Sequence, residues 1–186
     1  MNPLLKQAAT SAVHSPDPEI RDSVLLAMEL LEQMPQHLER WQSSLAKNQT
    51  LASCLQLGAE AIVRSRRLAT RLCDDGDFLL ALPLAMVCAS YASDDPEHCF
   101  LAGTCLQRLG QPASAVHFYR VALQLNEADA ASAYRLAECL EAVEQSEQAS
   151  HLYQWVTELA RGNFALRGLQ DMASARLAQL TAARRA

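Results

Sequence analysis

Thiol groups are the most reactive side chains in this sequence, and their spacing decides what chemistry they could carry. The six cysteines are Cys54, Cys73, Cys88, Cys99, Cys105 and Cys139. No two of them form a C-x-x-C pair, and their separations match no pattern of zinc ligands. We therefore expect reduced thiols that act as small buried apolar side chains, rather than a metal or redox centre.

Imidazole and carboxylate groups form no recognisable catalytic set either. The histidines are scattered along the chain: His14, His37, His98, His117 and His151. The pairs Asp74-Asp75 and Asp94-Asp95 stand beside predicted turns, where carboxylates more often cap helices than bind metals. The sequence contains no G-x-S-x-G, phosphate-binding loop, dinucleotide fingerprint or H-E-x-x-H motif. We expect no enzyme activity, no cofactor and no metal.

Composition and charge narrow the class of protein further. Half of the residues are hydrophobic and only 5% are aromatic, which favours helices packed through alanine and leucine. The net charge of −5 disfavours a nucleic-acid partner. The five arginines in residues 161–186 are expected on a solvated helix surface, with a partner-contacting tail as the alternative. Because no secretory signal and no long apolar run is present, we expect a cytoplasmic protein without membrane insertion.

A period of 34 residues runs through the middle of the chain. Small residues recur where two helices would cross, glycines where a first helix would end, and tyrosines where a large side chain would fill a gap. The matching sets are Ala69, Gly103 and Ala137; Gly76 and Gly110; Ala81, Ala115 and Ala149; and Tyr119 and Tyr153. This pattern resembles the tetratricopeptide repeat. The resemblance implies an all-α, right-handed superhelix of three helix-turn-helix repeats.

The period places the repeats at residues 62–95, 96–129 and 130–163. Two positions depart from the pattern. Glu144 stands where the other repeats have the turn glycine, which predicts a strained or differently capped turn. Pro83 lies in the second helix of the first repeat, where proline is tolerated near the helix start and kinks the helix further in.

The N-terminal flank predicts a flexible segment followed by a helical extension. Residues 1–18 are expected to be flexible because they end in the breaker cluster S-P-D-P. In residues 19–61, Pro35 is expected to end a first helix, a second to span 38–47, and a third to begin near Thr50. The extension has two interpretations: it caps the repeats, or its apolar face forms a homodimer.

The C-terminal flank predicts one more helix. Residues 164–186 follow Asn163, a good helix cap, and carry apolar residues near helical spacing. We expect this helix to cap the last repeat, whose hydrophobic face would otherwise be exposed.

The resemblance to tetratricopeptide proteins also implies where a partner would bind. The concave groove would be lined by the first helix of each repeat. Its facing residues would be Arg66, Thr70, Cys73, Phe100, Thr104, Gln107, Tyr134, Glu138 and Glu141. Phe100 and Tyr134 are the candidate anchors, since aromatic side chains contribute strongly to interfaces. The alternative is that these two rings pack against the N- or C-terminal extension.

Two segments resemble a narrower family. The segments are Phe100–Gln111, with sequence FLAGTCLQRLGQ, and Tyr134–Leu140, with sequence YRLAECL. They are similar to repeat helices of the class II chaperones of bacterial type III secretion, and the resemblance covers residues 62–163. It implies a cytoplasmic chaperone that binds an extended segment of hydrophobic translocator proteins in its groove before their export. It also implies a possible homodimer through residues 19–61.

Other functions remain open from the sequence alone. The chain could be a tetratricopeptide scaffold or regulatory adaptor, or a needle-subunit chaperone of the same apparatus. An adaptor that clamps a peptide carboxylate needs basic groove residues, whereas Arg66 stands beside Glu138 and Glu141 in the predicted groove. This charge pattern favours an extended client over a clamped C-terminus.

Overall fold

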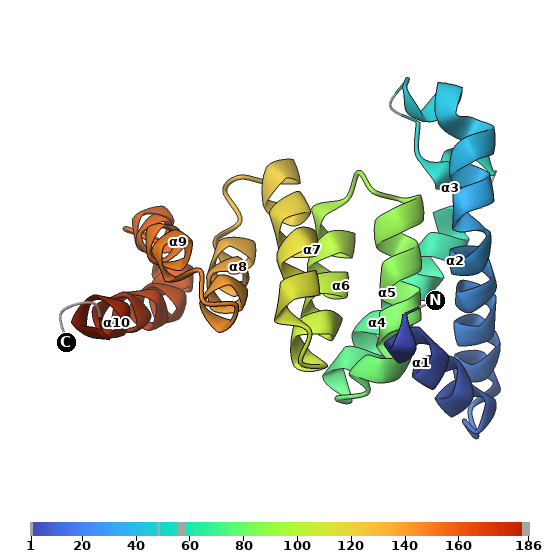
Figure 1. Cartoon of the computed structure of the whole chain (residues 1–186), viewed down its shortest axis with the longest axis horizontal. Helices are drawn as coiled ribbons and strands as arrows, with labels where there is room; N and C mark the ends of the chain where they lie inside the picture. The colour runs from blue at the N-terminus through green and yellow to red at the C-terminus, as the bar shows by residue number, and fades with distance from the viewer. Residues whose placement is uncertain (1, 48, 56–58, 184–186) are drawn as a thin grey trace.

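Helices make up all the secondary structure of the part of the chain described by this computed structural model, residues 2–47, 49–55 and 59–183. The elements are α1 (Pro3–Val13), α2 (Pro18–Leu45), α3 (Leu51–Cys54), α4 (Ala59–Asp74), α5 (Phe78–Tyr91), α6 (Pro96–Arg108), α7 (Pro112–Leu125), α8 (Ala130–Ala142), α9 (Ser146–Leu159), the 3-10 helix η1 (Phe164–Leu166) and α10 (Arg167–Ala183). They form an elongated row that runs from α2 at one end to α10 at the other (Figure 1). The predicted all-α class is confirmed.

Three helix pairs occupy the region of the predicted repeats. Helix α4 packs on α5, α6 on α7, and α8 on α9, and each pair packs on the next through α5 with α6 and α7 with α8. Helices α6 and α8 begin at Pro96 and Ala130, the first residues of the second and third predicted repeats. Their caps are Asp95 and Asp129, whose carboxylates accept backbone N–H groups. The pairs stack as in a tetratricopeptide superhelix.

A left-handed residue ends the first helix of every pair. Its φ is 85° at Gly76, 72° at Gly110 and 63° at Glu144. The next amide in each turn donates to a carbonyl five residues earlier: Asp77 to Leu72 at 2.7 Å, Gln111 to Leu106 at 2.9 Å and Gln145 to Leu140 at 2.8 Å. This bond is typical of a Schellman turn. The third repeat therefore keeps the turn of the other two and places a glutamate in a conformation that favours glycine.

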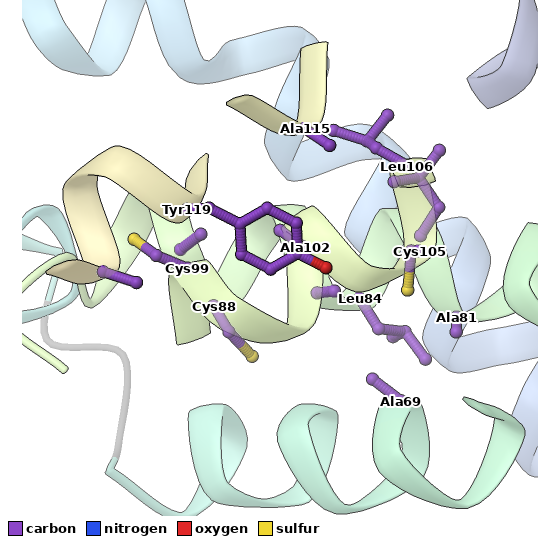
Figure 2. Packing of buried hydrophobic residues seen from close by; sticks show 14 of the residues in the cluster. Ala69, Ala81, Leu84, Cys88, Cys99, Ala102, Cys105, Leu106, Ala115 and Tyr119 are labelled. Atoms are coloured by element: carbon purple, nitrogen blue, oxygen red, sulfur yellow. The ribbon is translucent and has the colours of Figure 1, made fainter. Parts of the chain in front are cut away.

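Small residues and buried tyrosines interlock within the helix pairs. Tyr119 and Tyr153 are fully buried. A Cβ atom at Gly103 would lie 2.9 Å from Cε1 of Tyr119, so the glycine makes room for the ring. Figure 2 shows this ring of α7 lying against α6 near Ala102. Because such interiors are close-packed, the small residue and the large one are both needed.

Residues 3–13 form a helix, which corrects the expectation that residues 1–18 are flexible. Asn2 caps α1 by accepting the Leu4 N–H at 2.9 Å. Leu5, Ala8 and Ala12 are buried, and α1 packs on both α2 and α5. The helix is stabilised by a surface that lies far along the chain, which is why the local pattern of apolar residues did not reveal it.

Helix α2 continues through Pro35 instead of ending there, which corrects a second expectation. The proline removes the N–H that would bond to the Leu31 carbonyl. Tyr91 of α5 holds α2 on both sides of this point. Its hydroxyl donates to the Leu30 carbonyl at 2.5 Å and accepts from His37 Nδ1 at 2.9 Å. These tertiary bonds favour one long helix over the two that were predicted, one ending at Pro35 and the other at residues 38–47.

Both ends of the stacked pairs are covered. Helices α1 and α2 pack on α5, and α10 packs on α9. As a result α5 is buried on nearly every side, and Pro83 at its sixth position is buried too while the helix runs unbroken to Tyr91.

No helix among the described residues is long and apolar enough to cross a membrane. We retain residues 1–18, 19–61, 62–163 and 164–186 as the proposed division of the chain.

Candidate peptide-binding groove

The first helices of the three pairs, α4, α6 and α8, carry all nine residues predicted to line the groove. Helix α4 contacts α6 directly, and α10 contacts α8. Helix α10 thus takes the place that the first helix of a fourth pair would have. The groove is formed by helices from sequence positions about one repeat apart, so each carries equivalent residues to the same side.

An open cleft of about 760 Å³ lies between α4 and α6. Its walls include Val63, Arg66, Arg67, Thr70, Phe100 and Leu101. Phe100 is half-buried, and its ring meets the edge of Tyr119 with centroids 5.6 Å apart and an interplanar angle of 61°. Arg66 forms an ion pair with Glu97 across the two helices. The cleft is therefore lined by both apolar and charged side chains, a combination common in ligand sites.

A chain of polar side chains follows the cleft in the middle of the groove. The buried Tyr119 hydroxyl donates to Gln107 Oε1 at 2.8 Å, and Gln107 Nε2 donates to Glu138 Oε2 at 3.2 Å. The same carboxylate oxygen accepts from Arg135 at 2.9 Å. Burial raises the pKa of Tyr119 above its ordinary value, so the hydroxyl stays a donor at neutral pH. Thr104 donates to the Phe100 carbonyl at 2.9 Å within α6.

At the α8 end of the groove, the α8 side chains already bond to side chains of α9 and α10. Glu141 accepts from the Tyr153 hydroxyl at 3.1 Å and from Arg176 of α10 at 3.0 Å. Tyr134 is only 6% exposed, and its ring packs on Tyr153 with centroids 5.6 Å apart. Contrary to the sequence-based expectation, Tyr134 has no free face for a partner, because its ring turns into the interface with α9.

The groove also contains a contact between two thiols. Cys73 Sγ of α4 lies 3.5 Å from Cys105 Sγ of α6. The sequence placed Cys73 in the groove, but no pattern of spacing indicated Cys105 as its neighbour. Six residues of the cleft wall were missed as well: Val63, Arg67, Arg71, Asp74, Glu97 and Leu101. An i, i+4 relation between Val63 and Arg67 was the available signal that these two share a face of α4.

Arg176 was missed as a groove residue because the basic C-terminal stretch was expected to be solvated surface. Its contact with Glu141 joins α10 to α8.

Within residues 2–47, 49–55 and 59–183, no group of three or more His, Cys, Asp or Glu side chains is placed to hold a metal ion. The arrangement offers shape, apolar area and hydrogen bonds, which are the means of binding a peptide.

Comparison with known proteins supports this class of fold. The profile of the family "Anaphase-promoting complex, cyclosome, subunit 3" matches residues 68–156. The first tetratricopeptide domain of Spaghetti (RPAP3), solved with the HSP90 peptide SRMEEVD, has a TM-score of 0.61 at 18% identity, over 69% of this chain and 97% of that one. No individual curated protein matches the sequence significantly. The chain has a tetratricopeptide-repeat fold.

Within this class, the fold resembles type III secretion proteins. A type III secretion complex from Aeromonas hydrophila matches with a TM-score of 0.72 at 18% identity, over 78% of this chain and 97% of that one. The Yersinia enterocolitica translocator chaperone SycD, in complex with a peptide of the translocator YopD, matches with a TM-score of 0.66 at 18% identity, over 69% and 98%. The chain therefore shares its fold with these proteins over more than two thirds of its length.

Proposed function

We propose that this protein is a chaperone that binds an extended segment of type III translocator proteins and keeps them soluble and unassembled before export. The observation that carries the proposal is the open cleft between α4 and α6, with half-buried Phe100 in its wall. The similarity in fold to SycD, which was solved with a translocator peptide, supports it. Such a chaperone acts in the cytoplasm, where translocators are made.

The cleft suits an apolar side chain of an extended client. Phe100, Leu101 and Val63 provide apolar contact area, and Val63 is 43% exposed. A translocator carries membrane-seeking segments, so covering one of them removes apolar surface that would otherwise aggregate. Thr70 and Gln107 stand on the same helices and provide groups that can hydrogen-bond a peptide backbone.

The client is expected to lie mainly over α4 and α6. The contact of Arg176 with Glu141 and the burial of Tyr134 leave less free surface at α8. Of the nine predicted groove residues, we keep Arg66, Thr70, Cys73, Phe100, Thr104 and Gln107 as client contacts. Tyr134, Glu138 and Glu141 are assigned to holding the groove in shape.

The main alternative is a scaffold or adaptor that holds a peptide C-terminus. A carboxylate clamp needs unpaired basic side chains that converge on one point. Arg66 is paired with Glu97, and Arg71 is paired with Asp17 and Glu19 of the α2 start. Since these pairs already satisfy two of the three arginines at the cleft, an extended internal segment is the better fit. A needle-subunit chaperone is the other alternative, with a different client for the same groove.

Binding of overlapping peptides from the translocator proteins of the source organism tests the proposal. We expect one internal peptide with apolar side chains to bind. Phe100→Ala should raise the Kd of this peptide by about tenfold or more, as for the loss of an interface anchor. Fluorescence anisotropy with labelled peptides measures the change, and co-expression with the whole translocator reports whether it stays soluble.

The matched control is Trp155→Ala. Trp155 is an aromatic residue of α9 that is 47% exposed and lies beside Leu123 and Leu152, away from the cleft. Its removal is expected to leave peptide affinity unchanged. Equal losses in both variants, or none in Phe100→Ala, would place the client elsewhere. Binding that requires a free peptide C-terminus would favour the adaptor.

A further inference from the structure

Two thiols from different repeats meet beneath the groove. Cys73 lies in the last turn of α4 and Cys105 in the last turn of α6, with their sulfur atoms 3.5 Å apart. No other pair among the six cysteines makes such a contact in the described part of the chain. Figure 2 shows the Cys105 sulfur pointing to the side of α6 on which α4 runs.

The surroundings of the two sulfurs differ in a way that suits thiol exchange. Cys105 is fully buried, whereas Cys73 is only half-buried and stands next to the turn at Gly76. A small-molecule disulfide can therefore approach Cys73 first, with Cys105 behind it as a resolving thiol. The sulfurs must approach by roughly 1.5 Å to bond. Since Cys73 is within two residues of the end of α4, the last turn can supply much of that movement.

We propose that Cys73 and Cys105 are a reversible disulfide site, whose oxidation by a small-molecule disulfide joins the groove helices α4 and α6 covalently. No metal or cofactor is required. The oxidant is a disulfide of the glutathione type, and a thiol of the same type reverses the reaction.

The exchange takes two balanced steps. The Cys73 thiolate attacks one sulfur of oxidised glutathione, which breaks that disulfide and releases one glutathione thiolate. The Cys73 contact and burial raise the pKa of the Cys105 thiol, so Cys105 gives up its proton only as it attacks the Cys73 sulfur of the mixed disulfide, which releases the second glutathione thiolate. Two protein thiols are oxidised, one glutathione disulfide is reduced, and the two protons pass to the released thiolates. The hydrogen bond with Cys105 lowers the pKa of the Cys73 thiol, which favours the first step despite nearby Asp74.

The disulfide would fix the distance between α4 and α6, which weaker contacts now determine. Helix α4 packs mainly on α5 and contacts α6 much less, and the main polar link between α4 and α6 is the exposed pair of Arg66 with Glu97. A covalent link across the same two helices would limit the width of the cleft beside Phe100. This last consequence rests on the proposed function, whereas formation of the bond does not.

The test is to titrate the full-length protein with mixtures of oxidised and reduced glutathione and to map disulfides by mass spectrometry without reduction. We expect one cross-linked peptide pair containing Cys73 and Cys105, and a midpoint of thermal unfolding raised by roughly 5–10 °C. Cys105→Ala is expected to stop at the glutathione adduct on Cys73. Cys139→Ala is the matched control, because Cys139 is also buried and should leave the cross-link intact.

Each possible result either supports the disulfide site or overturns it. A wild-type protein that accumulates only glutathione adducts, or that cross-links other cysteines equally, would overturn the proposal. Circular dichroism confirms that each alanine variant is folded before it is scored. Peptide affinity is measured separately on the oxidised and reduced forms. A cross-link with unchanged affinity would uphold the disulfide site and count only against the position of the client.

Discussion

Glu144 shows how strongly the repeat imposes its backbone on a single residue. In the first two repeats a glycine adopts the left-handed conformation, and in the third a glutamate does so with φ of 63°. A residue with a Cβ is strained there by about 1–2 kcal/mol. The turn still forms because the amide of Gln145 bonds to the Leu140 carbonyl at 2.8 Å and because α8 packs on α9.

Replacing Glu144 with glycine should therefore stabilise the protein. We expect the free energy of unfolding to rise by roughly 0.5–1 kcal/mol, since the relief of strain is partly offset by the greater freedom of glycine in the unfolded chain. Urea denaturation followed by circular dichroism measures this change. Gly110→Ala is the reverse control, because it places a Cβ at a left-handed position. We expect its free energy of unfolding to fall by about 1 kcal/mol or more. A loss of stability in Glu144→Gly would mean that the glutamate side chain itself supports the turn.

Helices whose stability is local could be predicted from the sequence, and helices that depend on distant partners could not. The repeat period predicted the first residues of α6 and α8, because small crossing residues recur in every unit and a turn glycine recurs in two of the three. Helix α1 was missed since its alanines are buried only against α2 and α5. The prediction that a helix ends at Pro35 was wrong for the same reason, because Tyr91 of the later helix α5 stabilises α2 around this proline. The repeat register predicted that Phe100 and Tyr134 both face the groove. It could not predict the inward turn of Tyr134, because that depends on packing with Tyr153.

Gly103 is the position where packing between two helices should be least tolerant. An added Cβ would lie 2.9 Å from Tyr119, and that ring is held by the bond from its hydroxyl to Gln107. We expect Gly103→Ala to destabilise the protein by roughly 1–3 kcal/mol, as overpacking in a core does. The same urea titration measures it.

Gly168→Ala provides the comparison within another helix. A Cβ at Gly168 in α10 meets no atom within 4 Å, so the higher helix propensity of alanine should raise stability by about 0.5–1 kcal/mol. If both alanine variants gained stability, the Tyr119 ring would have to move freely, and the interlocked packing described for α6 and α7 would be wrong.

On the scale of the whole molecule, α2 covers the repeat stack with one apolar face and also carries exposed leucines. Val24, Ala27, Met28 and Leu31 are buried and cover the end of the repeat stack. Leu26 and Leu38 point outward, 53% and 46% exposed. Leu26 lies beside a small cleft that also includes Leu30 and Ile62. The capping role of the extension thus leaves Leu26 and the small cleft beside it exposed, and the proposed homodimer through residues 19–61 would form there.

This proposed dimer predicts that Leu26→Glu lowers the mass in solution without unfolding the protein. An isologous contact places the same surface of α2 in both partners, so one substitution puts a charge into the interface twice. We expect multi-angle light scattering to report a dimer for the full chain and a monomer for Leu26→Glu, with unchanged helicity. Substitution is the appropriate test because deleting the extension would expose the core residues that α1 and α2 cover. Val13→Glu on α1, where the side chain is 56% exposed, should leave the dimer intact. A monomeric wild type, or a variant that keeps the dimer mass, would leave α2 with the capping role alone.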